Sequence, residues 1–110
     1  MTSDEVRVML VDDSAVIRGL IARMIEGEPG LRVAASVGNG QMAVDRLKTQ
    51  PVDVIILDIE MPVMDGLTAI PLLLAAKPDV KIIMASTLTE KNADISLRAL
   101  QAGAADYVPK

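Results

Sequence analysis

The chain has 110 residues and a net charge of −4, and it contains neither histidine nor cysteine. This length is enough for one domain with a hydrophobic core. The missing residue types exclude disulfides, thiol catalysis, a Ser-His-Asp triad and the usual nitrogen–sulfur zinc sites. Any bound metal would need oxygen ligands, which favours Mg²⁺, Ca²⁺ or Mn²⁺. The acidic charge without a basic cluster argues against direct binding to nucleic acid.

The sequence carries no signal for export or for membrane insertion. Its start, Met1-Thr2-Ser3-Asp4-Glu5, is acidic rather than typical of a signal peptide. No apolar run approaches the roughly 18 residues that are needed to span a membrane. We therefore expect a cytoplasmic domain that makes no membrane contact.

Apolar runs alternate with segments of helical spacing along the whole chain. A buried strand is expected over residues 7–11, followed by a helix over 14–26 with Ser14 as its N-cap. The remaining strands are expected over 31–37, 53–58, 81–85 and 105–108, and the remaining helices over 41–49, 67–76 and 90–101. Strands that alternate with helices predict a parallel sheet with helices on both faces.

Two helices carry more detailed expectations. In the helix over 41–49, we expect Met42, Ala43 and Leu47 to face the core. Pro71 conflicts with the helical pattern over 67–76, so that helix either starts near Pro71 or is kinked there.

Polar side chains are expected at the carboxyl ends of three strands, where ligands bind in open parallel sheets. Asp12 and Asp13 follow the first apolar run, Asp58 ends the third, and Ser86 follows the fourth. Two strands that deliver carboxylates to one edge form a negative pocket, which can hold a hard divalent cation and present one aspartate as a nucleophile. Taken singly, the acidic pair or Ser86 could instead cap a helix, and Lys110 could be solvated.

The chain resembles the receiver domain of two-component response regulators. The motifs that carry the resemblance cover nearly all of it: 11–14 (Val-Asp-Asp-Ser), 57–66 (Leu-Asp-Ile-Glu-Met-Pro-Val-Met-Asp-Gly), 84–86 (Met-Ala-Ser) and 102–110. The resemblance implies a flavodoxin-like, doubly wound α/β fold with a five-stranded parallel sheet in the order 2-1-3-4-5. It also implies one receiver domain over residues 1–110 that stops after the fifth strand, without the family's final helix. The sheet face shared with the first helix is then expected to be partly uncovered.

The resemblance also assigns the phosphorylation site and the metal site. It implies that Asp58 accepts a phosphoryl group from a histidine kinase. Asp13 and Asp58 would bind Mg²⁺ directly, together with the backbone carbonyl of Glu60. Asp12 would hold a water molecule that coordinates the ion.

Three further residues receive switch roles from the same resemblance. Ser86 would bond to the phosphoryl oxygens in the active state, and Lys110 would pair with the phosphoryl group. Tyr107, the one aromatic residue of the chain, would change rotamer on activation. Together these roles describe a phosphorylation-activated switch in signal transduction.

A narrower resemblance connects the chain with chemotaxis. Segments 11–18, 86–91 and 96–110 are similar to the receiver half of the chemotaxis protein-glutamate methylesterase. In that family a C-terminal esterase domain follows the receiver, and phosphorylation relieves its inhibition. This chain lacks the histidine of an esterase site, so the resemblance implies a regulatory part of such an enzyme, served by a sensor or chemotaxis histidine kinase. The alternative is a stand-alone receiver that acts on a target protein.

Two other classes compete with this interpretation. Asp58-Ile59-Glu60 superficially matches the acid-x-acid nucleophile of haloacid-dehalogenase-like phosphatases. Those enzymes place the nucleophile on the first strand and an acidic pair late in the chain, which is the reverse of the order here. A receiver that only binds partners, without phosphorylation, would not need the complete set of acidic and switch residues.

Overall fold

The computed structural model describes residues 5–58, 66–86 and 106–109. Within these ranges the chain forms β1 (Val6–Val11), α1 (Ala15–Glu26), β2 (Leu31–Val37), α2 (Gly40–Leu47), β3 (Val54–Asp58), α3 (Gly66–Ala76), β4 (Lys81–Ser86) and β5 (Asp106–Pro109). The expected strands and helices in these ranges are confirmed, with ends that differ by at most two residues. The helix expected over 90–101 lies outside the described residues.

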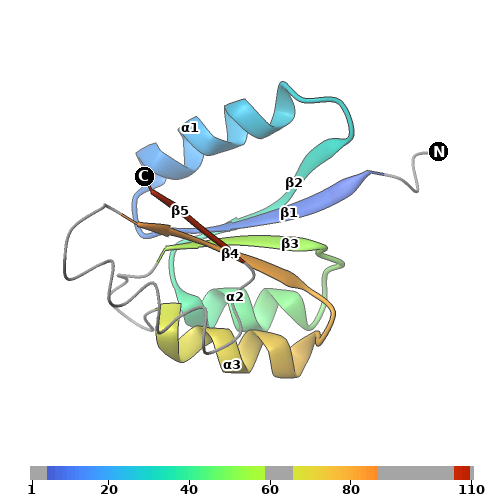
Figure 1. Ribbon diagram of the computed structural model, residues 1–110, viewed down its shortest axis with the longest axis vertical. Helices are drawn as coiled ribbons and strands as arrows, with labels where there is room; N and C mark the ends of the chain where they lie inside the picture. The colour runs from blue at the N-terminus through green and yellow to red at the C-terminus, as the bar shows by residue number, and fades with distance from the viewer. Residues whose placement is uncertain (1–4, 59–65, 87–105, 110) are drawn as a thin grey trace.

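The strands form one parallel sheet in the order β2-β1-β3-β4-β5. Figure 1 shows this sheet edge-on, with α1 on one face and with α2 and α3 on the other. The doubly wound, flavodoxin-like fold and its strand order are therefore confirmed. The strand order switches direction at β1, which lies between β2 and β3. Ligands of such sheets bind next to this switch point, outside the carboxyl ends of the strands.

The face of the sheet that carries α2 and α3 holds the larger hydrophobic core. Alternate residues of β3 and β4 point to this face, and all four are almost completely buried: Ile55, Leu57, Ile82 and Met84. They pack in one cluster with apolar residues of both helices, among them Leu47 and Ile70. This core fixes β3, and therefore the position of the aspartate at its end.

The face that carries α1 is less completely covered among the described residues. Val54 and Ile56 are only half-buried there, packed against a small cluster of Val8, Leu10 and Ile25. The outer surface of α1 exposes three large apolar side chains, with exposed fractions given in parentheses: Val16 (72%), Leu20 (52%) and Met24 (72%). The family resemblance predicts that this face is partly uncovered.

One detailed expectation about the helices is wrong, and one of the two alternatives for Pro71 is excluded. Met42 is 46% exposed rather than buried. The inward stripe of α2 begins at Gly40 and continues at three- and four-residue spacing through Ala43 to Leu47, so Met42 falls outside it. Helix α3 does not start near Pro71, because Pro71 lies inside it and is exposed.

Among the described helices, none combines the length and apolar character that crossing a membrane requires.

An ion pair joins β1 to the start of β3 at the amino edge of the sheet. The Arg7 side chain donates to both carboxylate oxygens of Asp53, at 3.0 and 3.1 Å, and the Arg7 backbone N–H donates at 2.9 Å. The hydrogen bonds from the Arg7 side chain and then from its backbone lower the pKa of Asp53 to about 2. This pair anchors the sheet at the edge opposite Asp58.

Asp53→Asn should lower stability at neutral pH by about 1 kcal/mol, a modest value because solvent screens this half-exposed pair. The folded-state pKa lies below the value of about 3.9 in the unfolded chain. The stabilisation is therefore complete above that value, and it declines as the pH falls towards 2. Urea unfolding at several pH values checks this, with exposed Asp45→Asn as the control. A gap between wild type and Asp53→Asn that stays constant from pH 7 to about 2 would contradict the assignment.

Candidate functional site

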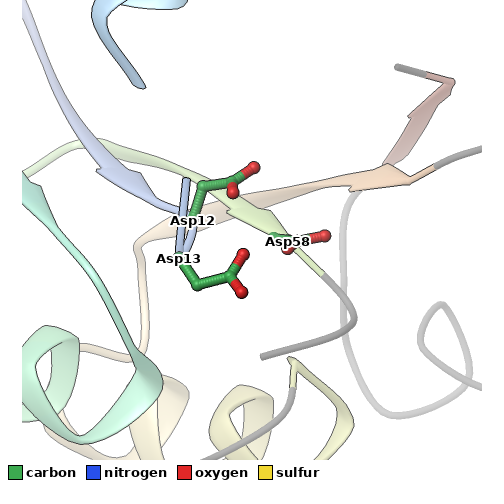
Figure 2. Close-up of side chains that lie close together, drawn as sticks. All are labelled: Asp12, Asp13 and Asp58. Atoms are coloured by element: carbon green, nitrogen blue, oxygen red, sulfur yellow. The ribbon is translucent and has the colours of Figure 1, made fainter. Parts of the chain in front are cut away.

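Three aspartates come together at the carboxyl edge of the sheet. Val11 of β1 pairs with Leu57 of β3, so Asp12 and Asp58, which follow these two residues, are neighbours. Asp13 follows directly, and oxygen atoms of all three carboxylates lie within 4.8 Å of one another. Figure 2 shows these side chains together at the ends of β1 and β3. Asp12 and Asp58 are buried, whereas Asp13 is exposed to solvent.

The loop between β1 and α1 is held by local hydrogen bonds. The Asp12 N–H donates to the Val37 carbonyl of β2 at 3.2 Å. An Asp12 carboxylate oxygen accepts from the Ser14 N–H at 2.9 Å, and the Ser14 hydroxyl accepts from the Ile17 N–H at 3.3 Å. Ser14 is therefore the N-cap of α1, as expected. Asp12 helps to form this turn and also belongs to the acidic cluster.

Arg18 also contacts this loop, a contact that the sequence patterns do not predict. It lies one turn beyond the start of α1, and its guanidinium Nη1 donates to the Asp12 carbonyl oxygen at 2.6 Å. Its Nε donates to the Ser36 hydroxyl of β2 at 2.9 Å. A basic residue one turn after an acidic pair is the signal that could have pointed to it.

The donor set of this acidic cluster fits a hard divalent cation. Two carboxylates about 4 Å apart repel each other by roughly 4 kcal/mol at an effective dielectric constant near 20. A divalent cation would remove much of this repulsion. Ligands on opposite sides of one Mg²⁺ lie about 4.2 Å apart, close to the 4.8 Å within which the three oxygens gather.

The other site residues expected from the sequence are described in part or not at all. Asp58 pairs with Ala85, which places the backbone of Ser86 at the same edge of the sheet. The backbone of Tyr107 lies in β5, opposite Met84. The side chains of Ser86 and Tyr107, and the whole of Glu60 and Lys110, lie outside the described part of the chain.

Comparison with known families assigns the chain to a family. Residues 8–110 match the response regulator receiver domain family. The chain belongs to this family. Over 108 residues, this receiver domain is 70% identical to the "protein-glutamate methylesterase/protein-glutamine glutaminase of group 2 operon" of Rhodospirillum centenum. The match covers 98% of the receiver but only 27% of that relative, so the chain spans about a quarter of its length.

Solved structures agree with this assignment. The response regulator domain of Thermotoga maritima CheB superposes with a TM-score of 0.89 at 38% identity, over 96% of the receiver and 78% of that chain. A chain from the complex of the CheA3 P1 domain with CheY6 of R. sphaeroides superposes with a TM-score of 0.80 at 41% identity. That match covers 98% of the receiver and 84% of the other chain. The receiver domain is therefore similar to chemotaxis response regulators in both sequence and fold.

Proposed function

We propose that residues 1–110 form a single receiver domain that acts as a phosphorylation-activated signalling switch. The observation that carries this proposal is the position of Asp58, buried at the end of β3 beside Asp12 and Asp13 at the switch point of the sheet. An Asp58 carboxylate oxygen attacks the phosphorus atom of a phosphohistidine on the kinase. The phosphorus–nitrogen bond breaks, and an acyl phosphate forms on Asp58.

Mg²⁺ fits this transfer because phosphoryl transfer depends mainly on positioning and on charge neutralisation. Asp13 and Asp58 are the proposed direct ligands, with the backbone carbonyl of Glu60. Asp12 is the proposed holder of a coordinating water, and its bond to the Ser14 N–H supports this less direct role. Mg²⁺ commonly uses only one or two carboxylates and keeps several waters.

The switch itself would use residues further along the sheet. Ser86 bonds to the phosphoryl oxygens, Lys110 pairs with the phosphoryl group, and Tyr107 changes rotamer when Ser86 moves. The backbones of Ser86 and Tyr107 lie in the adjacent strands β4 and β5, with Tyr107 opposite Met84, and this proximity supports these roles. The family resemblance alone supports the role of Lys110.

The wild-type domain should take up one phosphoryl group from acetyl phosphate in the presence of Mg²⁺. Intact-mass spectrometry measures this directly, and the same reaction in excess EDTA should give no adduct. Acetyl phosphate removes the need for a cognate kinase, so the result depends on the receiver domain alone. Absence of an adduct with Mg²⁺, or equal labelling in EDTA, would contradict the proposed chemistry.

The similarity to methylesterases suggests which activity the switch controls. We propose that the receiver regulates a protein-glutamate methylesterase domain and that a chemotaxis histidine kinase phosphorylates it in the cytoplasm. The name of the Rhodospirillum centenum relative and the CheA3–CheY6 complex support this choice. The alternative is a stand-alone receiver that acts by binding a target protein.

The protein encoded by the whole gene allows a test between the methylesterase regulator and the stand-alone receiver. If the receiver controls a methylesterase, the longer protein should hydrolyse methylated glutamates on chemoreceptors faster after treatment with acetyl phosphate. Asp58→Asn in the same protein should remove the stimulation and keep the basal rate. A gene that ends shortly after Lys110, or an esterase rate independent of Asp58, would favour the stand-alone receiver.

A further inference from the structure

We propose that Arg18 is a positioning residue for the metal site, because it fixes the peptide group that carries Asp12 and Asp13. The inference rests on the proposed function and adds to it a residue outside the acidic cluster. The Asp12 carbonyl belongs to the peptide unit between Asp12 and Asp13, and Arg18 Nη1 donates to it at 2.6 Å. The orientation of this peptide sets the direction in which the Asp13 side chain leaves the backbone.

The Asp12 backbone is held on both of its polar sides. Its N–H donates to the Val37 carbonyl of β2, and its carbonyl accepts from Arg18. Arg18 is itself tied to β2, since its Nε donates to the Ser36 hydroxyl. The guanidinium also lies against the end of β2, where a Cβ added to Gly38 would lie 3.5 Å from Nη1. Arg18 thus joins α1, the loop after β1 and the end of β2.

Arginine suits this role better than lysine. The planar guanidinium presents several N–H donors in a fixed fork, and here two of its nitrogens reach acceptors on different segments. A lysine at the same position keeps the positive charge but offers one flexible nitrogen. Arg18→Lys therefore separates the effect of geometry from the effect of charge.

Whether Mg²⁺ affinity rises or falls when Arg18 is replaced also separates an effect of geometry from an effect of charge. A positive charge beside a cation site repels the cation, so removing Arg18 should tighten Mg²⁺ binding if charge is all that it contributes. If Arg18 positions Asp12 and Asp13, its removal should weaken Mg²⁺ binding despite the lost repulsion. Residues that orient metal ligands typically change metal affinity by about 10- to 100-fold when they are replaced.

The experiment compares Arg18→Ala and Arg18→Lys with wild type. The control is Arg23→Ala, which removes the same charge from an exposed position near the end of α1. Titration calorimetry with Mg²⁺ alone should show affinity about tenfold weaker for Arg18→Ala, a clear loss for Arg18→Lys, and no change for Arg23→Ala. Equal or tighter Mg²⁺ binding by both Arg18 variants would overturn the inference.

A second readout needs no metal. In the metal-free protein, amide hydrogen exchange at Asp12 and Ser14 should be faster in both Arg18 variants than in Arg23→Ala. Both amides donate hydrogen bonds within the loop that Arg18 holds through the Asp12 carbonyl. Unchanged exchange at these two amides would overturn the positioning role. If wild type itself binds no Mg²⁺, the proposed metal site fails, and hydrogen exchange still decides whether Arg18 orders the loop.

Discussion

Asp58→Asn should abolish labelling by acetyl phosphate and, at the same time, stabilise the metal-free protein. Labelling disappears because the amide offers no carboxylate oxygen to attack phosphorus. Stability rises because one of three crowded carboxylates loses its charge. The gain is on the order of 1 kcal/mol, a fraction of the roughly 4 kcal/mol estimated for a close pair, since Asp13 is exposed and solvent screens it.

Asp45→Asn is the matched control for this prediction. It makes the same chemical change on the exposed surface of α2, where Asp45 accepts one hydrogen bond from Gln41. Its labelling and its stability should both resemble those of wild type. Intact-mass spectrometry measures the labelling, and urea unfolding in EDTA measures the stability. A phosphoryl adduct on Asp58→Asn would exclude Asp58 as the acceptor, and a loss of stability would contradict carboxylate repulsion.

Leu57→Ala should destabilise the domain by about 3 kcal/mol, within the usual range for a large residue cut to alanine in a packed core. Leu57 is completely buried between the sheet and the helices α2 and α3. Its truncation leaves a cavity that the surrounding strands cannot fill without moving. The same truncation should weaken Mg²⁺ binding, because Leu57 precedes Asp58 and fixes the end of β3.

Ile56→Ala provides the comparison, since Ile56 lies next to Leu57 but points to the opposite face of the sheet. Ile56 is only half-buried on the α1 side. Its truncation should therefore cost less than that of Leu57. Urea unfolding followed by circular dichroism measures both variants. Equal losses of stability would contradict the deeper burial of Leu57 than of Ile56.

The sequence predicts the parallel sheet and the acidic edge well because both depend on short-range patterns. Continuous apolar runs mark β1 and β3, and a parallel sheet must bring their carboxyl ends to one edge, with Asp12 and Asp58 beside each other. The strand order has a different origin. The apolar pattern predicts where the strands are, but it does not predict which strands lie next to each other in the sheet. The order 2-1-3-4-5 follows from the family resemblance.

The contacts that the sequence could not supply are long-range or depend on exact orientation. Arg18 and Ser36 are 18 residues apart, and Arg7 and Asp53 are 46 apart, so the helical and strand patterns show only that these residues are polar. The apolar side chain of Met42 predicts an inward position, but the buried stripe of α2, which includes Ala43, lies on another side of the helix.

The small cluster beneath α1 links the stability of one helix to the behaviour of the acidic edge. Among the described residues, α1 rests on far fewer buried side chains than α2 and α3 do. Segments with few buried apolar contacts open locally at a lower free energy than the whole domain. Such opening would release the Ser14 cap and the Arg18 contact together, and with them the loop that presents Asp13. A ligand that requires the ordered loop must then oppose this local unfolding. A substitution at Ile25, near the far end of the helix, would thereby tune ligand affinity without touching the site.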